Sequence, residues 1–434
     1  MKRRGLLAAL TVVIVLVGSL AMPAGRSGTA RASHTDVVID WNLTMLATFW
    51  STNLPPPVGN RDGAIVQAAV FDALNGIERR YTPIHVAAAA PPGASRQAAV
   101  VSAAYTALVS LFPTQKASLD AAFASSIAAI AEDEQGGSQS IARGLAWGKT
   151  VADAISAWRA TDGFAATPPP YVFGTAPGEW KPTPGGSGPP KFRTLATTTP
   201  FALTSPSQFR PAGPPALTSA RYTASFNEVK AYGGQVSTVR TAYQTETAKF
   251  WQLDTVTGIW DRVADSLLQS DHRDLLQHAR ILALTDIAFA DSTIATWDAK
   301  NTFNFWRPVT AISQAATDGN PDTSPDPNWL PLLVTPYFQE YPSAHAGISS
   351  GGASVLASFY GANAEFTATS QGLPGVERTF HSFADAVAQI ADARVFAGFH
   401  YRFSTDDGIQ MGKQVAAQVE RTMMLPLHGE GEPH

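Results

Sequence analysis

The sequence predicts an all-α protein made of two helical bundles. Apolar residues recur at spacings of three and four in one segment after another, whereas the alternation that marks β-strands is hard to find. The 434 residues are 45% hydrophobic and 15% charged, the composition of a globular chain long enough for a large core or two adjoining ones. The chain has no cysteine, so packing must hold the fold together without disulfides.

Residues 1–32 have the pattern of a secretory signal peptide. A basic start at residues 2–4 precedes an apolar run at 6–22, and residues 30–32 form a small-residue cleavage site. We therefore expect a secreted, extracytoplasmic protein whose mature chain begins near residue 33, and the paired arginines favour the twin-arginine route. The alternative is that the apolar run remains as an uncleaved anchor.

The charge balance indicates which partners to expect. Removal of residues 1–32 would take away five basic residues and no acidic one, lowering the formal net charge from −4 to −9. A mildly acidic exported protein has no electrostatic reason to bind nucleic acid or an anionic membrane. We expect small-molecule partners, no nucleic acid and no stable membrane insertion of the mature chain. The sequence also lacks an HExxH motif, a cysteine cluster and an acidic calcium loop.

The first bundle is predicted at residues 33–161. Five segments have the helical repeat of apolar residues with short connections between them. They are residues 37–50, 62–81, 95–111, 116–130 and 138–158. Residues 162–215 then form a Pro-, Gly- and Thr-rich connecting loop, and its Trp180, Phe192 and Phe201 predict that it packs on the body of the protein.

The second bundle is predicted at residues 216–434. Helical periodicity resumes there, with a Pro-rich loop at residues 318–336. The segments predicted to be helical are residues 220–232, 245–251, 258–268, 273–290, 297–308, 349–360, 383–398 and 407–424.

The stretch at residues 297–308, WDAKNTFNFWRP, carries the first candidate site. On one helix, Lys300 and Arg307 would lie two turns apart on the same stripe, roughly 10 Å along the axis, and Pro308 would end it. Both cations could then lean onto one small anion. A solvated basic face is the alternative, but the surrounding Phe and Trp residues leave little of this helix to water. Cations in an apolar setting need a counter-charge, which points to an anionic ligand.

Two further motifs carry polar chemistry. Ser343 is a natural N-cap after Pro342, so its hydroxyl and the following backbone N–H groups would form an anion site, although such a Ser is often only a cap. Downstream, Gly398 offers a helix end that lets His400 turn back toward Arg394, with the next helix beginning after the capping residue Thr405. Taken alone, His400 could equally be a buried structural histidine.

The three motifs together resemble the signature of one superfamily. It unites the vanadium-dependent haloperoxidases, bacterial acid phosphatases and type-2 phosphatidic acid phosphatases, and its motifs are Lys-x6-Arg-Pro, Pro-Ser-x-His and Arg-x3-Gly-x-His in this order. The likeness covers residues 250–408 and is closer to the haloperoxidases. The residues that carry it are Lys300, Arg307, Pro308, Pro342, Ser343, His345, Arg394, Gly398 and His400.

The resemblance implies a haloperoxidase/acid phosphatase-like fold and a role for each site residue. Vanadate would be the cofactor, with phosphate able to occupy the same site. The residues that would hold the oxyanion are Lys300, Arg307, Ser343, the N–H of Ala344, and Arg394. His400 would ligate vanadium and His345 would be the acid–base catalyst. Trp297 and Phe338 match aromatic residues near the halide region of fungal chloroperoxidases, and Asp254 matches the carboxylate partner of the arginine in the third motif.

The resulting prediction is a secreted vanadium-dependent haloperoxidase-like enzyme that uses vanadate and hydrogen peroxide to oxidise halide, with an organic acceptor or a phosphate ester as a further small-molecule partner. The first alternative is a secreted acid phosphatase in which His400 attacks phosphorus and His345 protonates the leaving alcohol. The second is a non-catalytic oxyanion-binding protein. Three residues depart from the pattern: Ala344 replaces a Gly, Ala393 a Ser, and Ser404 the Asp that orients the phosphatase nucleophile.

Overall fold

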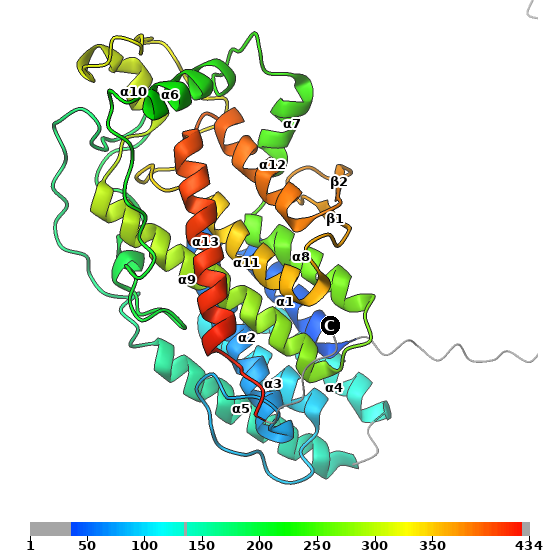
Figure 1. The fold of residues 1–434 in the computed structure, drawn as a ribbon. Coiled ribbons are helices and arrows are strands. Elements are labelled where there is room, and N and C mark those ends of the chain that lie inside the picture. Colours follow the sequence, from blue (N-terminus) through cyan, green and yellow to red (C-terminus); the bar gives the residue numbers. More distant parts are fainter. Residues whose placement is uncertain (1–35, 134–136, 428–434) are drawn as a thin grey trace, which may run out of the picture. The chain divides into compact units, whose positions relative to one another are not determined.

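The computed structural model describes residues 36–133 and 137–427. The predicted signal peptide at residues 1–32 lies outside these residues. Within them the fold is mostly helical, as Figure 1 shows, so the all-α prediction is confirmed. A two-stranded hairpin is the exception in the described part of the chain.

The first five helices agree with the predicted segments to within a few residues, except that the second begins earlier. They are α1 (Val37–Ser51), α2 (Pro56–Glu78), α3 (Arg96–Leu111), α4 (Lys116–Asp133) and α5 (Gly137–Arg159), with a short 3₁₀ helix η1 (Pro113–Gln115) before α4. The helix α2 begins at a proline, whose fixed φ suits the first helical turn. No single described helix is long and apolar enough to cross a membrane; Arg96–Leu111 and Pro113–Ile130 pass that test only as a pair, bent by 118°.

The second half is arranged around one long helix. Its elements are η2 (Arg193–Thr197), α6 (Ala220–Tyr232), α7 (Ala242–Phe250), α8 (Val256–Gln269), α9 (Leu275–Phe303), α10 (Pro308–Ser313), η3 (Ala315–Thr317), α11 (Ala344–Tyr360), α12 (Phe383–Phe396) and α13 (Arg402–Thr422). The helix α9 joins two segments predicted separately, and its side chains are buried on nearly all faces because α2, α11 and α13 pack around it.

The close packing of α11 against α13 brings the start of α11 next to the start of α13. A Cβ atom at Gly412 would lie 2.1 Å from the carbonyl oxygen of Gly347, and one at Gly408 would lie 2.7 Å from that of Ser343. Both distances are far shorter than a carbon–oxygen contact allows. Glycine at these positions therefore lets the two helices approach, and this approach positions the residues at their N-terminal ends.

The hairpin pairs β1 (Phe366–Thr369) with β2 (Glu377–Phe380) in antiparallel register, Phe366 opposite Phe380. These two rings are buried against the core, and the strand residues that alternate with the buried positions are exposed. The all-α prediction missed the hairpin because each strand has only four residues, too few for the alternation to stand out.

The Pro- and Gly-rich connecting loop packs on the body of the protein, as predicted. Trp180 and Phe201 are buried. The backbone N–H of Trp180 donates to the carbonyl of Asn304 (2.7 Å), and the buried carboxylate of Asp291 accepts three backbone N–H groups beginning at Phe201. One contiguous cluster of buried apolar side chains includes residues from both halves of the chain. The boundaries at residues 33–161, 162–215 and 216–434 stay a prediction.

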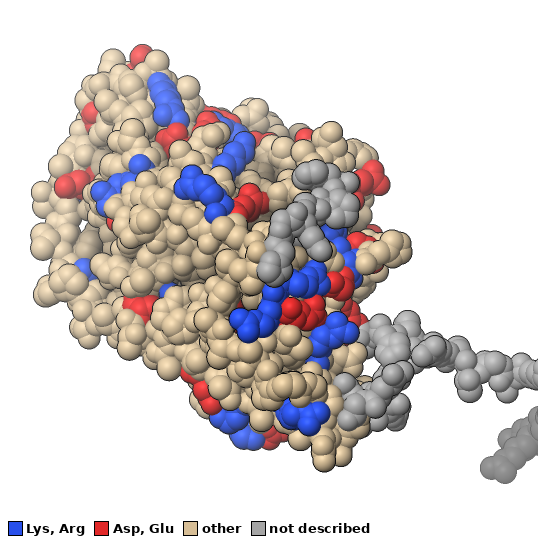
Figure 2. Space-filling model, turned by 60° about the horizontal axis from the view of Figure 1, so that its bottom comes forward, with Lys and Arg blue, Asp and Glu red and all other residues tan. Residues whose placement is uncertain are grey.

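On the face shown in Figure 2, basic and acidic side chains lie close to one another on a surface that is otherwise uncharged.

The interior contains a cluster of acids: three carboxyl groups lie in the core between α8 and α9. Asp261, Asp265 and Asp286 are all buried, and Asp265 Oδ1 accepts a hydrogen bond from Asn42 (2.9 Å). Burial raises the pKa of Asp265 to about 7, and burial together with mutual repulsion raises those of Asp261 and Asp286 well above the usual value.

This cluster predicts that the fold is stabilised by acid. The unfolded-state pKa of Asp is about 4, so the contribution of Asp265 is fully present below that pH and is lost as the pH rises to about 7. We expect the unfolding temperature of Asp265→Asn to fall less between pH 4 and pH 8 than that of the wild type, measured by thermal denaturation. Asp153→Asn, on an exposed part of α5, should keep the wild-type pH dependence. Equal pH dependence for Asp265→Asn and the wild type would contradict this assignment.

Candidate active site

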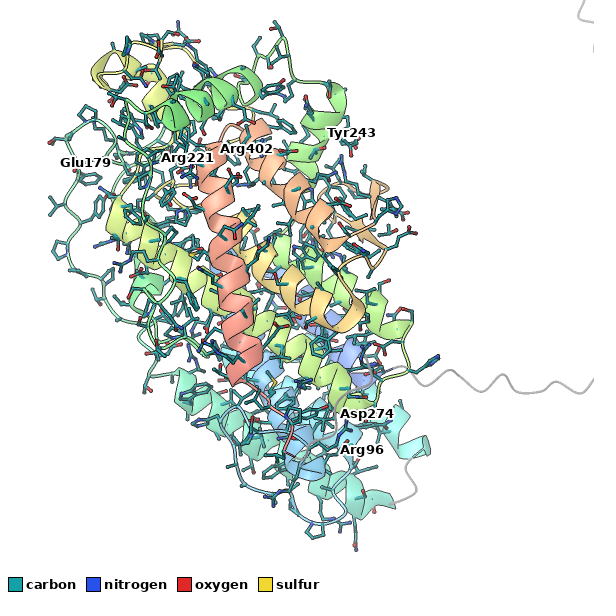
Figure 3. All side chains as sticks on the ribbon, in the orientation of Figure 1. Arg96, Glu179, Arg221, Tyr243, Asp274 and Arg402 are labelled. Carbon is teal, nitrogen blue, oxygen red and sulfur yellow. The ribbon has the colours of Figure 1, made fainter. Side chains whose placement is uncertain are left out.

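The predicted site residues come from three separate stretches of the second half. Lys300 lies in the last turn of α9, Arg307 in the link to α10, Ser343 at the N-cap of α11, Arg394 in the last turn of α12 and His400 in the link to α13. All five are buried, with exposed fractions of 0 or 1%. In Figure 3 the labelled Arg402, two residues beyond His400, marks the N-terminal end of α13.

The prediction that Lys300 and Arg307 share one helix is wrong. The helix α9 ends at Phe303, and Asn304 adopts the left-handed conformation with φ of 47°. Pro308 explains the break, because its ring would clash with the carbonyl of Asn304 in a continuous helix. Pro308 instead starts α10, and Arg307, at the N-cap, has an extended backbone. The two cations meet through this turn and not along one helical stripe.

Lys300 contributes charge and also holds the segment before α11. Its ammonium donates to the backbone carbonyls of Gln339 (2.9 Å), Glu340 (2.8 Å) and Pro342 (2.6 Å). An ammonium has three N–H groups, so each of them already has an acceptor. Burial, and next the charge of Arg307, lowers the pKa of Lys300.

Three buried polar atoms face the site without a partner. Arg307 donates through Nε to the carbonyl of Phe338 (2.8 Å) and through Nη1 to that of Phe399 (2.9 Å). Arg394 donates through Nη1 to Gln252 Oε1 (2.6 Å). Within the described chain, however, Arg307 Nη2, Arg394 Nε and Ser343 Oγ have no hydrogen-bond partner. Buried donors normally have a hydrogen-bond acceptor, so these three atoms could each donate to a bound ligand.

The structure assigns His400 an orienting carboxylate that the sequence analysis missed. His400 Nδ1 lies 2.8 Å from Glu340 Oε1, and Ser404 Oγ lies farther away, at 3.4 Å. Glu340 thus has the orienting role that the sequence analysis expected of an Asp at position 404, which is Ser404 here. No spacing rule links residues 340 and 400, although a lone acid directly before Tyr-Pro-Ser was a signal available in the sequence.

The protonation state of His400 follows from its two neighbours. Arg307 Nη1 lies 3.1 Å from His400 Nε2 and can only donate, so Nε2 must accept and the ring proton sits on Nδ1, facing Glu340. Burial, and then the charges of Arg307, Lys300 and Arg394, holds the pKa of His400 well below its usual value. The imidazole is therefore neutral, with its lone pair on Nε2.

The start of the last helix also differs from the prediction. The helix α13 begins at Arg402, so Thr405 is not its cap; Tyr401 is the N-cap and its backbone N–H donates to Glu340 Oε1 (3.1 Å). Asp407, an acid near the start of α13 that could have replaced the missing Asp at 404, instead accepts from the hydroxyl of Tyr341 (2.7 Å) and from Arg221 (2.8 Å).

His345 and Ala344 occupy the first turn of α11. Ala344 is the first helical residue and has no positive φ, so its N–H belongs to the free donors at the helix start. His345 is partly exposed. Burial, and then the charges of Arg394, Arg307 and Lys300, lowers its pKa well below the usual value, which leaves the ring neutral and able to accept a proton.

Aromatic rings border the cations. The rings of Trp297 and Phe338 lie 5.0 Å apart, and Phe338 lies under both Lys300 Nζ (5.3 Å) and the guanidinium of Arg307 (5.0 Å). Phe192 of the connecting loop adds a third ring, 6.1 Å from Trp297. The loop therefore reaches the site.

The predicted contact between Asp254 and Arg394 is wrong. Asp254 instead pairs with Arg262, and it accepts the backbone N–H of Gln371 (2.7 Å). Arg394 is held by Gln252, two residues before Asp254. Arg262 lies eight residues along the chain, on α8, so its side chain reaches this carboxylate, whereas Arg394 is already bound to Gln252.

The charges and the free donors fit a tetrahedral oxyanion. Burial raises the pKa of Glu340 to about 7. With Lys300 as an ammonium and Glu340 ionised, the three cations exceed this single carboxylate by two charges. Burial lowers the pKa of Arg307 to about 10 and that of Arg394 to about 9, so both stay charged at neutral pH. A doubly charged vanadate or phosphate would balance this excess and accept from the three unpaired donors.

Ser343 gives a test that separates a capping role from a ligand role. Its hydroxyl makes no cap hydrogen bond, so Ser343→Ala should leave the free energy of unfolding unchanged but weaken phosphate binding about tenfold, the value of one hydrogen bond to a charged group. Binding is measured by titration calorimetry and stability by urea denaturation. The control is Ser382→Ala, which removes a real cap on Asp385 N (3.0 Å) and should cost about 1 kcal/mol without affecting binding. The opposite pattern would contradict the ligand role.

The tautomer of His400 gives a second test. In ¹⁵N-histidine-labelled protein, we expect one ring with Nδ1 protonated and Nε2 unprotonated from pH 5 to pH 8, because the neighbouring cations disfavour imidazolium. Glu340→Gln should shift the Nδ1 signal of that ring and so assign it. A doubly protonated His400 at pH 7 would contradict the assignment.

Comparison with known proteins finds relatives in sequence and in fold. A family model described as the VCPO second helical-bundle domain matches residues 280–429. The vanadium chloroperoxidase of Curvularia inaequalis is 27% identical over 262 residues, a match that covers 44% of this chain and 42% of that protein, or less than half of its length.

Solved structures share the fold over most of the chain. A bacterial vanadium-dependent iodoperoxidase aligns with a TM-score of 0.74 and 24% identity, covering 91% of this chain and 97% of that one. A bacterial vanadium-dependent chloroperoxidase in its holo form aligns with a TM-score of 0.65 and 18% identity, covering 90% and 96%. The family match lies in the half that contains the site, and the chain shares the helical fold of these vanadium-dependent enzymes over most of its length.

Proposed function

We propose that this protein is an exported vanadium-dependent haloperoxidase that uses vanadate and hydrogen peroxide to oxidise halide. The observation that carries the proposal is the buried group of three cations with unpaired donors beside a neutral His400. Support comes from the relatives, which are named as chloroperoxidases and an iodoperoxidase.

Each residue of the site would have a distinct task. The unpaired hydrogen-bond donors would bind vanadate oxygens; they belong to Arg307, Arg394 and Ser343. Lys300, whose N–H groups bind backbone carbonyls, would contribute its positive charge without a direct hydrogen bond to vanadate. His400 would ligate vanadium through Nε2, while Glu340 keeps the proton on Nδ1. Vanadate held by these residues would supply Lewis-acid activation of peroxide, with no redox change at the metal.

His345 would handle the proton of hydrogen peroxide. Its neutral ring is partly exposed, so a nitrogen of the imidazole can accept a proton as peroxide enters and return it as water leaves. A halide would approach from the side of Trp297 and Phe338, where the rings displace water and the charge of Arg307 attracts an anion.

An acid phosphatase is the second candidate, and the pair of Glu340 and His400 favours it. A neutral imidazole with its lone pair on Nε2 and a carboxylate on Nδ1 is the arrangement that a histidine nucleophile for phosphorus requires. Because Glu340 supplies this carboxylate, Ser404 in place of an Asp does not argue against hydrolysis. Phosphate and vanadate share shape and charge, so the cations alone would hold either one. A non-catalytic oxyanion-binding protein would use the same contacts.

Export rests on the sequence of residues 1–32 alone, which resembles a signal peptide with a twin-arginine pair. An exported enzyme without cysteine has no thiol for peroxide or oxidised halogen to attack. This composition suits the proposed chemistry.

Two assays on the purified protein test the proposal. Vanadate, hydrogen peroxide and halide supplied together should halogenate an activated carbon acid, and omission of any one should abolish the reaction. His400→Ala should lower turnover at least about a hundredfold, by loss of the vanadium ligand, whereas His381→Ala, at an exposed histidine, should have no effect. Hydrolysis of an aryl phosphate, abolished by His400→Ala, with no halide oxidation would instead identify a phosphatase. Phosphate binding that survives His345→Ala, with neither activity, would identify a binding protein.

A further inference from the structure

Arg394 differs from the other two cations of the candidate active site in the charges that surround it. The negative charge of Glu340 acts on both Lys300 and Arg307 and opposes their mutual repulsion. Arg394 is fully enclosed and forms no ion pair with an acid in the described part of the chain. After burial, the charge that lowers its pKa is that of Arg307, which has the same sign. The positive charge of Arg394 is therefore the least compensated of the three.

The side chain that holds Arg394 is a neutral amide. Gln252 Oε1 accepts a hydrogen bond from Arg394 Nη1 (2.6 Å). A guanidinium can only donate, so the amide must present its oxygen and not its NH₂ group. A glutamate of the same length would make this contact as a salt bridge, and its charge would offset that of the arginine. The amide thus fixes the direction of Arg394 and leaves its positive charge in place.

The link between α7 and α8 is attached to the helix that carries Arg394. Phe250 and Trp251, which precede Gln252, are both buried. Trp251 Nε1 donates to Gln389 Oε1 (3.0 Å), and Gln389 lies on α12, five residues before Arg394. Gln252 therefore reaches Arg394 from a segment that is bound to the same helix, which makes it a positioning residue for the arginine.

The closest carboxylate along the chain is engaged elsewhere. Asp254 lies two residues after Gln252 and pairs with Arg262. The same carboxylate accepts the backbone N–H of Gln371 (2.7 Å). Asp254 is therefore committed to α8 and the hairpin, and it does not take the place of a counter-charge for Arg394.

We propose that Gln252 adjusts the oxyanion site to doubly charged anions, because it directs Arg394 without offsetting its charge. The inference deepens the proposed function and rests on the anion site that this function requires. Coulomb energy is proportional to the product of the charges, so an uncompensated positive charge favours a dianion over a monoanion of the same shape. The favoured class comprises vanadate and phosphate as dianions. For the phosphatase alternative it comprises phosphate monoesters and not diesters, which carry a single charge.

Two tetrahedral anions of different charge give the test. Titration calorimetry of the full chain at pH 8, without vanadate, peroxide or halide, would measure the affinities of sulfate, a dianion, and perrhenate, a monoanion. Gln252→Glu keeps the hydrogen-bond acceptor and adds one negative charge. It should weaken sulfate binding about tenfold and perrhenate binding about threefold, since the monoanion loses half as much free energy. The hydration of each anion is the same for both proteins and cancels from the comparison.

Gln414→Glu is the matched control, because it adds the same charge elsewhere. Gln414 is exposed on α13, roughly 18 Å along the helix from its first residue. At an ionic strength of about 0.15 M the screening length is about 8 Å, so neither affinity should change in this variant. Circular dichroism and thermal denaturation confirm that each variant is folded.

The other outcomes contradict the inference in distinguishable ways. If Gln252→Glu binds sulfate as tightly as the wild type or more tightly, Gln252 only positions Arg394, because a glutamate would do so at least as well. Equal weakening for the two anions would show a disturbed site and would overturn the charge effect. A wild type that binds neither anion would overturn the anion site and the inference together. The predicted change in a protein that oxidises no halide would refute the proposed function and leave the inference intact.

Discussion

Three cations and one carboxylate are buried together in the second half of this chain, and this imbalance of charge is the constraint on which the site depends. Enclosed charges cost several kcal/mol each unless they are paired. Lys300 meets this cost through three backbone carbonyls and Arg307 through two, but the free hydrogens of Arg307 and Arg394 have no acceptor within the described residues. An oxyanion bound there would supply the missing acceptors and balance the excess positive charge.

The backbone around the site is held by the same side chains that would do the chemistry. Lys300 ties the segment before α11, and Glu340 of that segment binds both His400 and the backbone N–H of Tyr401. The starts of α11 and α13 are thereby joined, and the glycines between these helices permit their close approach. The position of His400 is consequently coupled to that of Lys300 through one short stretch of chain.

The cations alone do not choose between vanadate and phosphate chemistry, since the two anions have the same shape and charge. The surroundings of the cations carry the distinction. Aromatic rings of α9, of the segment before α11 and of the connecting loop border one side, and the neutral amide of Gln252 holds Arg394 on another. The connecting loop, which has no part in the three motifs, therefore contributes to the surroundings of the site.

The amino-acid sequence by itself determined the helical character, most helix positions and the set of residues that meet at the site, because helical periodicity, caps and short motifs are local properties. It failed where a contact joins distant residues. The end of α9 at Asn304, the pairing of Asp254 with Arg262 and the carboxylate of Glu340 on His400 were decided by the tertiary structure. Burial and proximity between chain segments settle which acid meets which base, and neither quantity can be calculated from spacing along the chain.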